Sequence, residues 1–421
     1  MRQLYLVAGV TMAGVSAVFA LFAELEKRYD LSTTSLGWIA GSAFIASLIA
    51  QLWLSRYADR GHAATLLRLG VLAAAVGLIW FAAATEVWQF VSARALLGAG
   101  VGMIVPPARR AIVISADGNS GERLGTFYAS YLAGFVFGPP IAGALTIVGD
   151  VRLPFAVFGV LTFLTLLSIL RMELPEGRPV VGATGDSAEA AADKRVLRRL
   201  LVERRIVAAL LVVVSFRYSI GVFEPLWATH LDDLGASTTT VTLSLTFFAL
   251  PMLLVARPAG RLSDRVGPRW ASLLAALATV PMMAIYGYVG VVWIIFAVAI
   301  PHGLMEAILS PGSQAAIAEA APDEDAASAQ GLAEASGSAA AAIGAFTAPA
   351  LFDLLGAGPA WLIAAIVMGG LLATSWLLDP PRRSSGSARE TLTTIDRQGD
   401  AGDEASLVAV EEQRRVGDIP T

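Results

Sequence analysis

Charged side chains that interrupt long apolar runs are the residues of this chain best suited to chemistry. Arg94 lies among alanines and leucines. Arg217 and Glu224 share a later apolar run, and another run holds both His302 and Glu306. A charge in the hydrocarbon of a bilayer costs about 2.5–3.5 kcal/mol on insertion scales, so such residues are candidates for function. These residue types predict proton exchange at a carboxyl group whose pKa is set by a nearby permanent positive charge.

Helical spacing places each pair on one face. Arg217 and Glu224 are two turns apart, and His302 and Glu306 are one turn apart. We predict that Glu224 carries a proton or binds a cation while Arg217 tunes it. His302 and Glu306 could relay a proton, although a hydrogen-bonded structural histidine is the favoured alternative. For Arg217 and Glu224 the alternative is an ion pair that only stabilises packing.

Apolar residues make up 56% of the 421 residues and charged residues only 15%, which predicts membrane helices, since each crossing uses about 20 apolar residues. The absence of Cys excludes a disulfide scaffold, and the net charge of −4 does not suggest nucleic acid as a partner. No metal or cofactor is predicted. We therefore expect an all-α membrane protein with twelve transmembrane helices. The predicted segments are 4–24, 36–56, 65–84, 88–108, 126–148, 153–171, 206–230, 238–258, 270–288, 291–311, 328–351 and 359–378.

The eleventh segment is the weakest by hydropathy, because residues 333–342 are almost all Ala, Gly and Ser. Small residues let helices approach closely in a bilayer, so we interpret it as a packed interior helix, with a surface loop as the alternative. Basic residues set the orientation. With a cytoplasmic N-terminus, 25 of the 30 Lys and Arg residues fall on the cytoplasmic side and three on the other. This asymmetry predicts a plasma-membrane protein with both termini in the cytoplasm.

A polar stretch at 172–205 divides the segments into six plus six. We predict an N-terminal bundle at 1–171, a cytoplasmic linker at 172–205, a C-terminal bundle at 206–378 and a disordered tail at 379–421. The basic end of the linker, 194–205, could form an amphipathic helix on the membrane surface or stay a solvated linker. Parallel repeats of six helices are one transporter architecture, with the substrate site between the halves.

Two loops carry similar motifs at equivalent places in the two halves. Asp-Arg pairs follow the second and eighth segments, 205 residues apart. The second copy resembles the loop motif G-x-L-x-D-R-x-G-x-R/K of the major facilitator superfamily, whereas Ser55 replaces the glycine in the first copy. We expect these loops to latch one transport state through ion pairs with neighbouring helices. The gating residues predicted here are Asp59, Arg60, Gly260, Asp264, Arg265, Gly267 and Arg269.

Two further motifs extend the resemblance. Arg94 and Gly98 look like the R-x-x-x-G signature of the superfamily. The resemblance implies that Arg94 acts on the pKa of a nearby acid, and a structural arginine bonded to helix carbonyls is the alternative. A glycine and proline pattern in the fifth segment is similar to one associated with twelve-helix drug:proton antiporters. Its residues, predicted to seal or hinge the helix or simply to pack closely, are Gly134, Gly138, Pro139 and Gly143. The resemblance implies the superfamily fold, and export of small molecules by alternating access, driven by protons.

The cavity predicted between the halves is apolar, with Gln51, Tyr131 and Trp227 as candidate lining residues, although core packing is the default for each. Such a cavity suits amphipathic molecules and drugs. A sugar or metabolite permease is the nearest alternative, since Gln51 and Trp227 could bind sugars. A non-transporting membrane sensor is the alternative from another class. We expect no enzymatic activity, a small-molecule substrate, protons and lipid as partners, and a monomer.

Overall fold

The computed structural model describes residues 1–57, 62–114, 120–172, 196–322 and 325–379. Over these ranges the chain forms helices joined by short turns, without strands. This arrangement suits a bilayer, because the backbone N–H and C=O groups of a helix form hydrogen bonds within the helix. The helices of the first half are α1 Arg2–Ala20, α2 Phe22–Tyr29, α3 Thr33–Tyr57, α4 Ala63–Ala83, α5 Val87–Ile114, α6 Ser120–Val148 and α7 Arg152–Ile169. Those of the second half are α9 Arg204–Asp233, α10 Thr238–Val266, α11 Pro268–Tyr286, α12 Val292–Ala320, α13 Ala326–Leu355 and α14 Ala357–Leu378.

Within the described ranges, twelve helices are long and apolar enough to cross a membrane, which confirms the predicted fold class. The remaining named helix, α2, corrects the first predicted segment. That segment was expected to run from 4 to 24, but α1 ends at Ala20 and the chain turns at Leu21 before α2 begins. The four charged residues of α2, Glu24, Glu26, Lys27 and Arg28, explain the break, because a continuous helix would carry them through the hydrocarbon.

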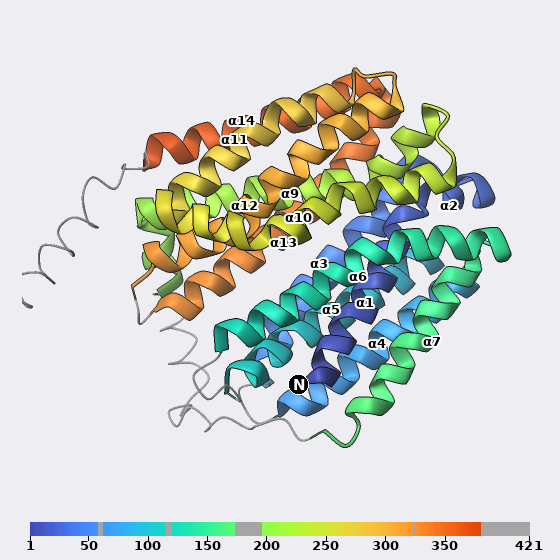
Figure 1. The fold of residues 1–421 in the computed structure, drawn as a ribbon, viewed down its shortest axis with the longest axis horizontal. Helices are drawn as coiled ribbons and strands as arrows, with labels where there is room; N and C mark the ends of the chain where they lie inside the picture. Colours follow the sequence, from blue (N-terminus) through green and yellow to red (C-terminus); the bar gives the residue numbers. More distant parts are fainter. Residues whose placement is uncertain (58–61, 115–119, 173–195, 323–324, 380–421) are drawn as a thin grey trace, which may run out of the picture. The chain divides into compact units, whose positions relative to one another are not determined.

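The helices gather into two bundles (Figure 1). In the first bundle α4 packs against α5 and α7, α3 against α5, and α1 against α6 and α7. In the second bundle α9 packs against α12, α13 and α14, and α11 against α12 and α14. The main contacts between bundles join α3 to α13 and α6 to α10. These two helix pairs therefore form most of the interface between the bundles.

The Ala-rich eleventh segment, predicted at 328–351, lies entirely within α13. Many of its alanines are buried, among them Ala333, Ala341 and Ala345, and the helix contacts both α9 and α3. Small side chains permit this close approach, since attraction between helices in lipid depends on packing. The prediction of a packed interior helix is confirmed, and the alternative of a surface loop is wrong.

The end of the linker is also helical, over residues 196–202. Its Leu200 is buried against the start of α9, while Leu197 and Leu201 are exposed. Arg199 forms an ion pair with the buried Asp325, which precedes α13. The linker therefore ends in a short helix attached to the second bundle. Whether it lies on a membrane surface, and the predicted domain limits, stay predictions, and 173–195 and 380–421 are outside the described residues.

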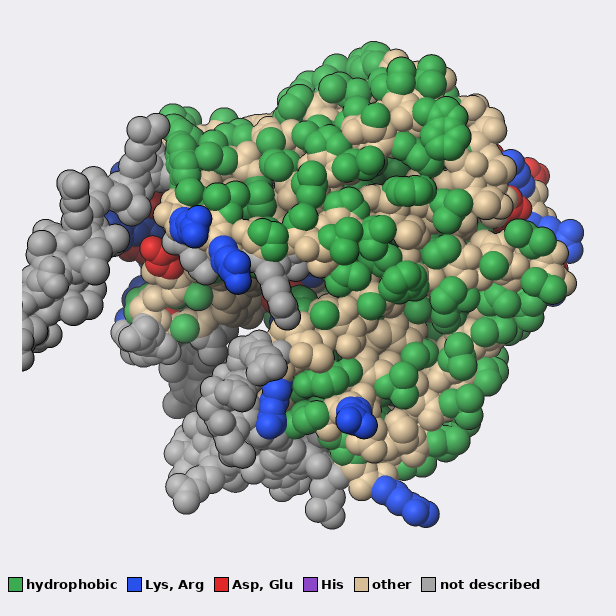
Figure 2. Space-filling view, viewed as in Figure 1, with side chains coloured by type: hydrophobic (Ala, Val, Ile, Leu, Met, Phe, Trp, Pro, Cys, Tyr) green, Lys and Arg blue, Asp and Glu red, His purple; other side chains and the backbone are tan. Residues whose placement is uncertain are grey.

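The side of the molecule in Figure 2 is covered by apolar side chains, and the charged ones lie mostly toward the helix ends. Large apolar residues are well exposed on helices of both bundles, including Leu164, Leu254, Trp293 and Ile366. In water such a surface would drive aggregation, so it is suited to contact with lipid chains. Polar contacts inside the bundles are consequently shielded from water on their lipid side.

Candidate functional site

A buried ion pair joins the two bundles. Arg94 of α5 donates a hydrogen bond from Nη2 to Oε1 of Glu224 on α9. Arg94 is 2% exposed and Glu224 8% exposed, so water scarcely reaches either charge. Burying one such charge alone is costly, and the partner offsets that cost. The structure thus supplies the nearby acid that was predicted for Arg94, and it lies on the opposite bundle.

Arg217 has a different partner from the predicted one. Its Nη2 lies 3.3 Å from Oε2 of Glu334 on α13, so the predicted pairing of Arg217 with Glu224 is wrong. Arg109 of α5 approaches the other oxygen of Glu334, with its Nη1 at 4.0 Å. The side chains of Arg109, Arg217 and Glu334 are 36%, 30% and 29% exposed, so they are only partly buried, unlike Arg94 and Glu224. We call Arg109, Arg217 and Glu334 the arginine cluster.

His302 and Glu306 of α12 do come together as predicted. Nε2 of His302 lies 3.6 Å from Oε1 of Glu306, too far for a hydrogen bond, and finds no other partner among the described residues. Nδ1 of His302 is 3.0 Å from the hydroxyl of Tyr286. The imidazole is fully buried and packs against the rings of Phe223, Phe248 and Tyr286. The second bundle therefore holds an acid and a base inside an aromatic shell.

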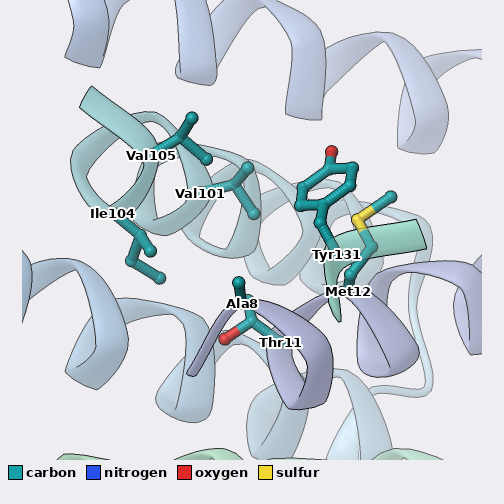
Figure 3. A pocket seen from close by; sticks show the side chains of 7 residues that line it. All are labelled: Ala8, Thr11, Met12, Val101, Ile104, Val105 and Tyr131. Atoms are coloured by element: carbon teal, nitrogen blue, oxygen red, sulfur yellow. The ribbon is translucent and has the colours of Figure 1, made fainter. Parts of the chain in front are cut away.

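The three predicted cavity residues have unlike surroundings. Tyr131 lines a pocket in the first bundle, between α1, α5 and α6 (Figure 3). Gln51 is half-buried and donates to the hydroxyl of Ser47, one turn away on its own helix. Trp227 is fully buried, stacks on Phe223 and donates from Nε1 to Ser244 at 2.8 Å. In this conformation Trp227 belongs to the core of the second bundle, whereas Tyr131 lines a small pocket of the first bundle.

The predicted glycines lie where helices meet. A Cβ on Gly138 of α6 would stand 2.5 Å from the carbonyl oxygen of Ala13, and Gly134 approaches Gly9 of α1 just as closely. Gly98 of α5 meets the backbone of α3. Gly143 faces Thr242 of α10, so it contributes to the contact between bundles. Pro139 is buried beside Gly138, and α6 remains helical through it. Close packing at these positions is established, and a hinge or seal stays a prediction.

The loop motif is only partly described. Asp59 and Arg60 lie outside the described residues, as does the side chain of Asp264. Arg265 is exposed at the end of α10, and Gly260 has open space beside it. Gly267 ends α10 with φ of +89°, a conformation that L side chains rarely adopt.

Arg269 acts at the end of another helix. It donates to the carbonyls of Ser375 and Asp379 at 3.1 and 3.3 Å, and to the Ser375 hydroxyl at 2.7 Å. It therefore caps the last turn of α14, where the Ser375 carbonyl also accepts from the backbone N–H of Asp379. The latch predicted for these loops remains a prediction.

Polar contacts that the sequence analysis missed join the bundles where α2 meets α9 and α10, a region we call the α2 end. Lys27 forms an ion pair with Asp232 at 2.5 Å, and Glu24 accepts a hydrogen bond from Thr238. Thr34 of α3 donates to Asp353 of α13 at 2.7 Å. The run of four charges in α2, directly after an apolar segment, was the signal for such a cluster, but its partners in the second bundle lie more than 200 residues away.

Glu26 is a partly buried carboxylate of the α2 end. It accepts hydrogen bonds from Thr33 on α3 at 3.0 Å and from Thr229 on α9 at 2.8 Å. Burial raises the pKa of the Glu26 carboxyl, the two hydroxyl donors oppose that shift, and the charges of Asp233 and Asp353 add to it. Hydrogen bonding to Asp232 raises the pKa of Lys27. In this structure burial therefore favours the protonated form of Glu26.

Comparison with known proteins decides the family. The profile of the Major Facilitator Superfamily matches residues 4–232 and 209–409. The chain belongs to this superfamily. It is therefore a multi-pass membrane transporter of small molecules and not an enzyme. The twelve candidate spans of the described residues and the sequence motifs agree with this family.

The chain is also similar to individual transporters. It is 26% identical over 242 residues to "Multidrug resistance protein 1" of Bacillus subtilis (strain 168), covering 56% of this chain and 60% of that protein, which is less than two thirds of its length. It is 23% identical over 322 residues to "Multidrug resistance protein MdtG" of Enterobacter lignolyticus (strain SCF1), covering 72% and 76%. A solved bacterial homologue of the human lysosomal transporter Spinster superposes with a TM-score of 0.71 at 14% identity, covering 91% and 97%, and supports the fold alone.

Proposed function

We propose that this protein exports small amphipathic molecules, drugs included, in exchange for protons by alternating access. The observation that carries the proposal is the Arg94–Glu224 pair, a buried guanidinium and carboxylate that connect the two bundles. The names of the multidrug resistance relatives support the same substrate class. In this proposal the protein lies in the plasma membrane with both termini in the cytoplasm, as the distribution of basic residues predicts.

The pair offers a direct route from proton binding to movement. A proton on Glu224 removes the charge that attracts Arg94 across the bundle interface. Breaking a buried ion pair changes the free energy by about 3–5 kcal/mol, whereas two transport states differ by only a few kcal/mol. Protonation of this one carboxyl is therefore sufficient to shift which state is populated. Glu306, next to His302 in the second bundle, is the second carboxyl proposed to exchange protons.

The contacts of the α2 end support a proposal about the state of this structure in the cycle. Lys27–Asp232, Glu24–Thr238 and Thr34–Asp353 connect the bundles there. By the predicted orientation the α2 end faces away from the cytoplasm. We infer that the structure is closed on the outer side, so that substrate enters from the cytoplasm and protons enter after these contacts have broken.

Proteoliposomes test the proposal. Protein is reconstituted with a pH gradient and an internal pH dye, and proton movement is recorded when a panel of drugs or sugars is added. We expect drugs to collapse the gradient, Glu224→Gln to abolish this response, and Glu319→Gln, at an exposed acid of α12, to leave it intact. Unchanged drug-driven proton movement in Glu224→Gln would remove that residue from the mechanism, and a response to sugars alone would favour a permease.

A further inference from the structure

We propose that the short helix at residues 196–202, which we call the linker helix, and the start of α9 together form a binding surface for anionic phospholipids. Exposed leucines of the linker helix would enter the boundary between headgroups and acyl chains, and neighbouring arginines would bind the lipid phosphates. This inference goes beyond the proposed transport function, because it does not depend on which molecule is transported.

One side of the linker helix is fixed to the second bundle. Leu200 is buried in an apolar cluster that also contains residues of α9, α12 and α13. Arg199 forms an ion pair with Asp325, a buried residue that directly precedes α13. These two anchors set the rotation of the helix about its own axis. The same contacts therefore decide which of its residues remain exposed.

The exposed residues of the linker helix are largely apolar. Leu197 is 42% exposed, Leu201 52% and Val202 74%. Leu197 and Leu201 are one helical turn apart, so they lie on the same face of the helix. Three neighbouring apolar side chains gain nothing from contact with water. The boundary between lipid headgroups and acyl chains accommodates such a face.

Arginines border the exposed leucines. Arg198 of the linker helix and Arg204 and Arg205 of α9 are exposed, and none of them forms an ion pair within the part of the chain that the structure describes. Glu203, the acidic residue among them, accepts a hydrogen bond from the backbone N–H of Arg205. Three guanidinium groups beside one carboxylate give the surface a positive charge. A guanidinium binds phosphate through two parallel hydrogen bonds.

The position of this surface favours a lipid as its occupant. Arg204 is the first residue of α9, which is long and apolar enough to cross a membrane, so the arginines lie at the end of a candidate span, where headgroups also lie. A soluble phosphate would bind the arginines and leave the leucines in water. A phospholipid offers an acyl chain to the leucines and a phosphate to the arginines, and a net negative charge strengthens the attraction.

Quenching by spin-labelled lipids tests this surface in the full-length protein. Because the sequence contains no Cys, Leu201→Cys provides a single attachment point for the fluorophore NBD. The labelled protein is placed in nanodiscs in which either phosphatidylglycerol or phosphatidylcholine carries a spin label near its headgroup. We expect spin-labelled phosphatidylglycerol to reach half-maximal quenching at about fivefold lower mole fraction, the effect of one basic residue near an anionic surface.

Two matched variants serve as controls. Leu164→Cys places the same fluorophore at an exposed apolar position of α7, where we expect the two lipids to quench equally. Arg198→Gln combined with Arg204→Gln and Arg205→Gln should remove the preference for phosphatidylglycerol at Leu201→Cys. Replacing the same three arginines by Lys should retain most of it, because the attraction depends mainly on charge. Unchanged quenching at Leu164→Cys in these variants shows that the bundles remain folded.

Three results would overturn the lipid surface. Equal quenching by both lipids at Leu201→Cys would show that the surface does not select anionic lipid. Quenching by neither lipid there, with normal quenching at Leu164→Cys, would show that the linker helix is solvated or covered by protein. An undiminished preference in the triple Gln variant would exclude the arginines as its cause. The nanodiscs contain no drug and no pH gradient, so none of these results depends on the proposed transport function.

Discussion

Replacing either member of the Arg94–Glu224 pair should destabilise the fold, but by unequal amounts. In Glu224→Gln the Arg94 guanidinium, which is 2% exposed, loses its counter-charge and cannot lose its proton. Loss of one partner of a buried ion pair costs about 3–5 kcal/mol, and we expect this variant to fall in that range. Arg94→Gln should cost less, because the remaining carboxyl can take up a proton and become neutral.

The double variant separates stability from transport. Arg94→Gln combined with Glu224→Gln removes both charges while leaving two side chains that can hydrogen-bond, so most of the lost stability should return. Unfolding is followed by tryptophan fluorescence at rising mole fractions of SDS, and the four proteins form a double-mutant cycle. Drug-driven proton movement is measured in proteoliposomes on the same preparations. We expect the double variant to be nearly as stable as the original protein and inactive.

Two results would refute this reasoning. If Glu224→Gln unfolds at the original SDS fraction, Arg94 is not a buried charge that depends on this partner. If the effects of the two substitutions simply add in the double variant, the residues are not coupled. An active double variant would leave the stability argument intact but would exclude the pair from proton coupling.

Three further predictions concern the helix contacts. Burial raises the pKa of Glu26, so the closed α2 end should hold a proton on this carboxyl more tightly than the open end. The protonated carboxyl therefore favours closure most at pH values below the ordinary pKa of 4.5. This contribution to closure is lost as the pH rises through the raised pKa of the closed state. Spin-label distances across the α2 end should report this shift, with site-specific labelling made simple by the absence of Cys, and Glu26→Gln should abolish it. Gly138→Leu should abolish transport, because its Cβ would meet a backbone carbonyl of α1, whereas Gly125→Leu on the same helix meets nothing within 4 Å and should retain it; equal activity of both would contradict close packing as the cause. Lys27→Asp should open the α2 end in the same distance measurement, and adding Asp232→Lys should close it again, a rescue that a merely structural defect would not allow.

The helices were predictable from the sequence because each span depends on its own residues. A run of about 20 apolar residues satisfies the requirement for crossing a bilayer whatever surrounds it. Even the weak span at α13 followed from its small residues, which pack closely against neighbours. The break at Leu21 was missed because the apolar run passes through it, and the charges that cause the break come only afterwards.

The candidate site was predictable as a set of residues but not as a set of contacts. Arg94, Arg217 and Glu224 are conspicuous in any apolar run, because a charge there needs compensation. Helical spacing suggested Arg217 as the partner of Glu224, since residues seven apart share a face. That partner was wrong, because a shared face does not bring side chains into contact when another helix offers a nearer charge.

The amino-acid sequence by itself determined the number of spans, their approximate limits and the residues whose burial demands a partner, because these depend on local hydropathy and on the cost of a charge in lipid. Only the tertiary structure decided which charges meet. Arg94 and Glu224 are 130 residues apart, and Lys27 and Asp232 are 205 apart. Their contact depends on how two bundles pack against each other, and no periodicity within one helix contains that information.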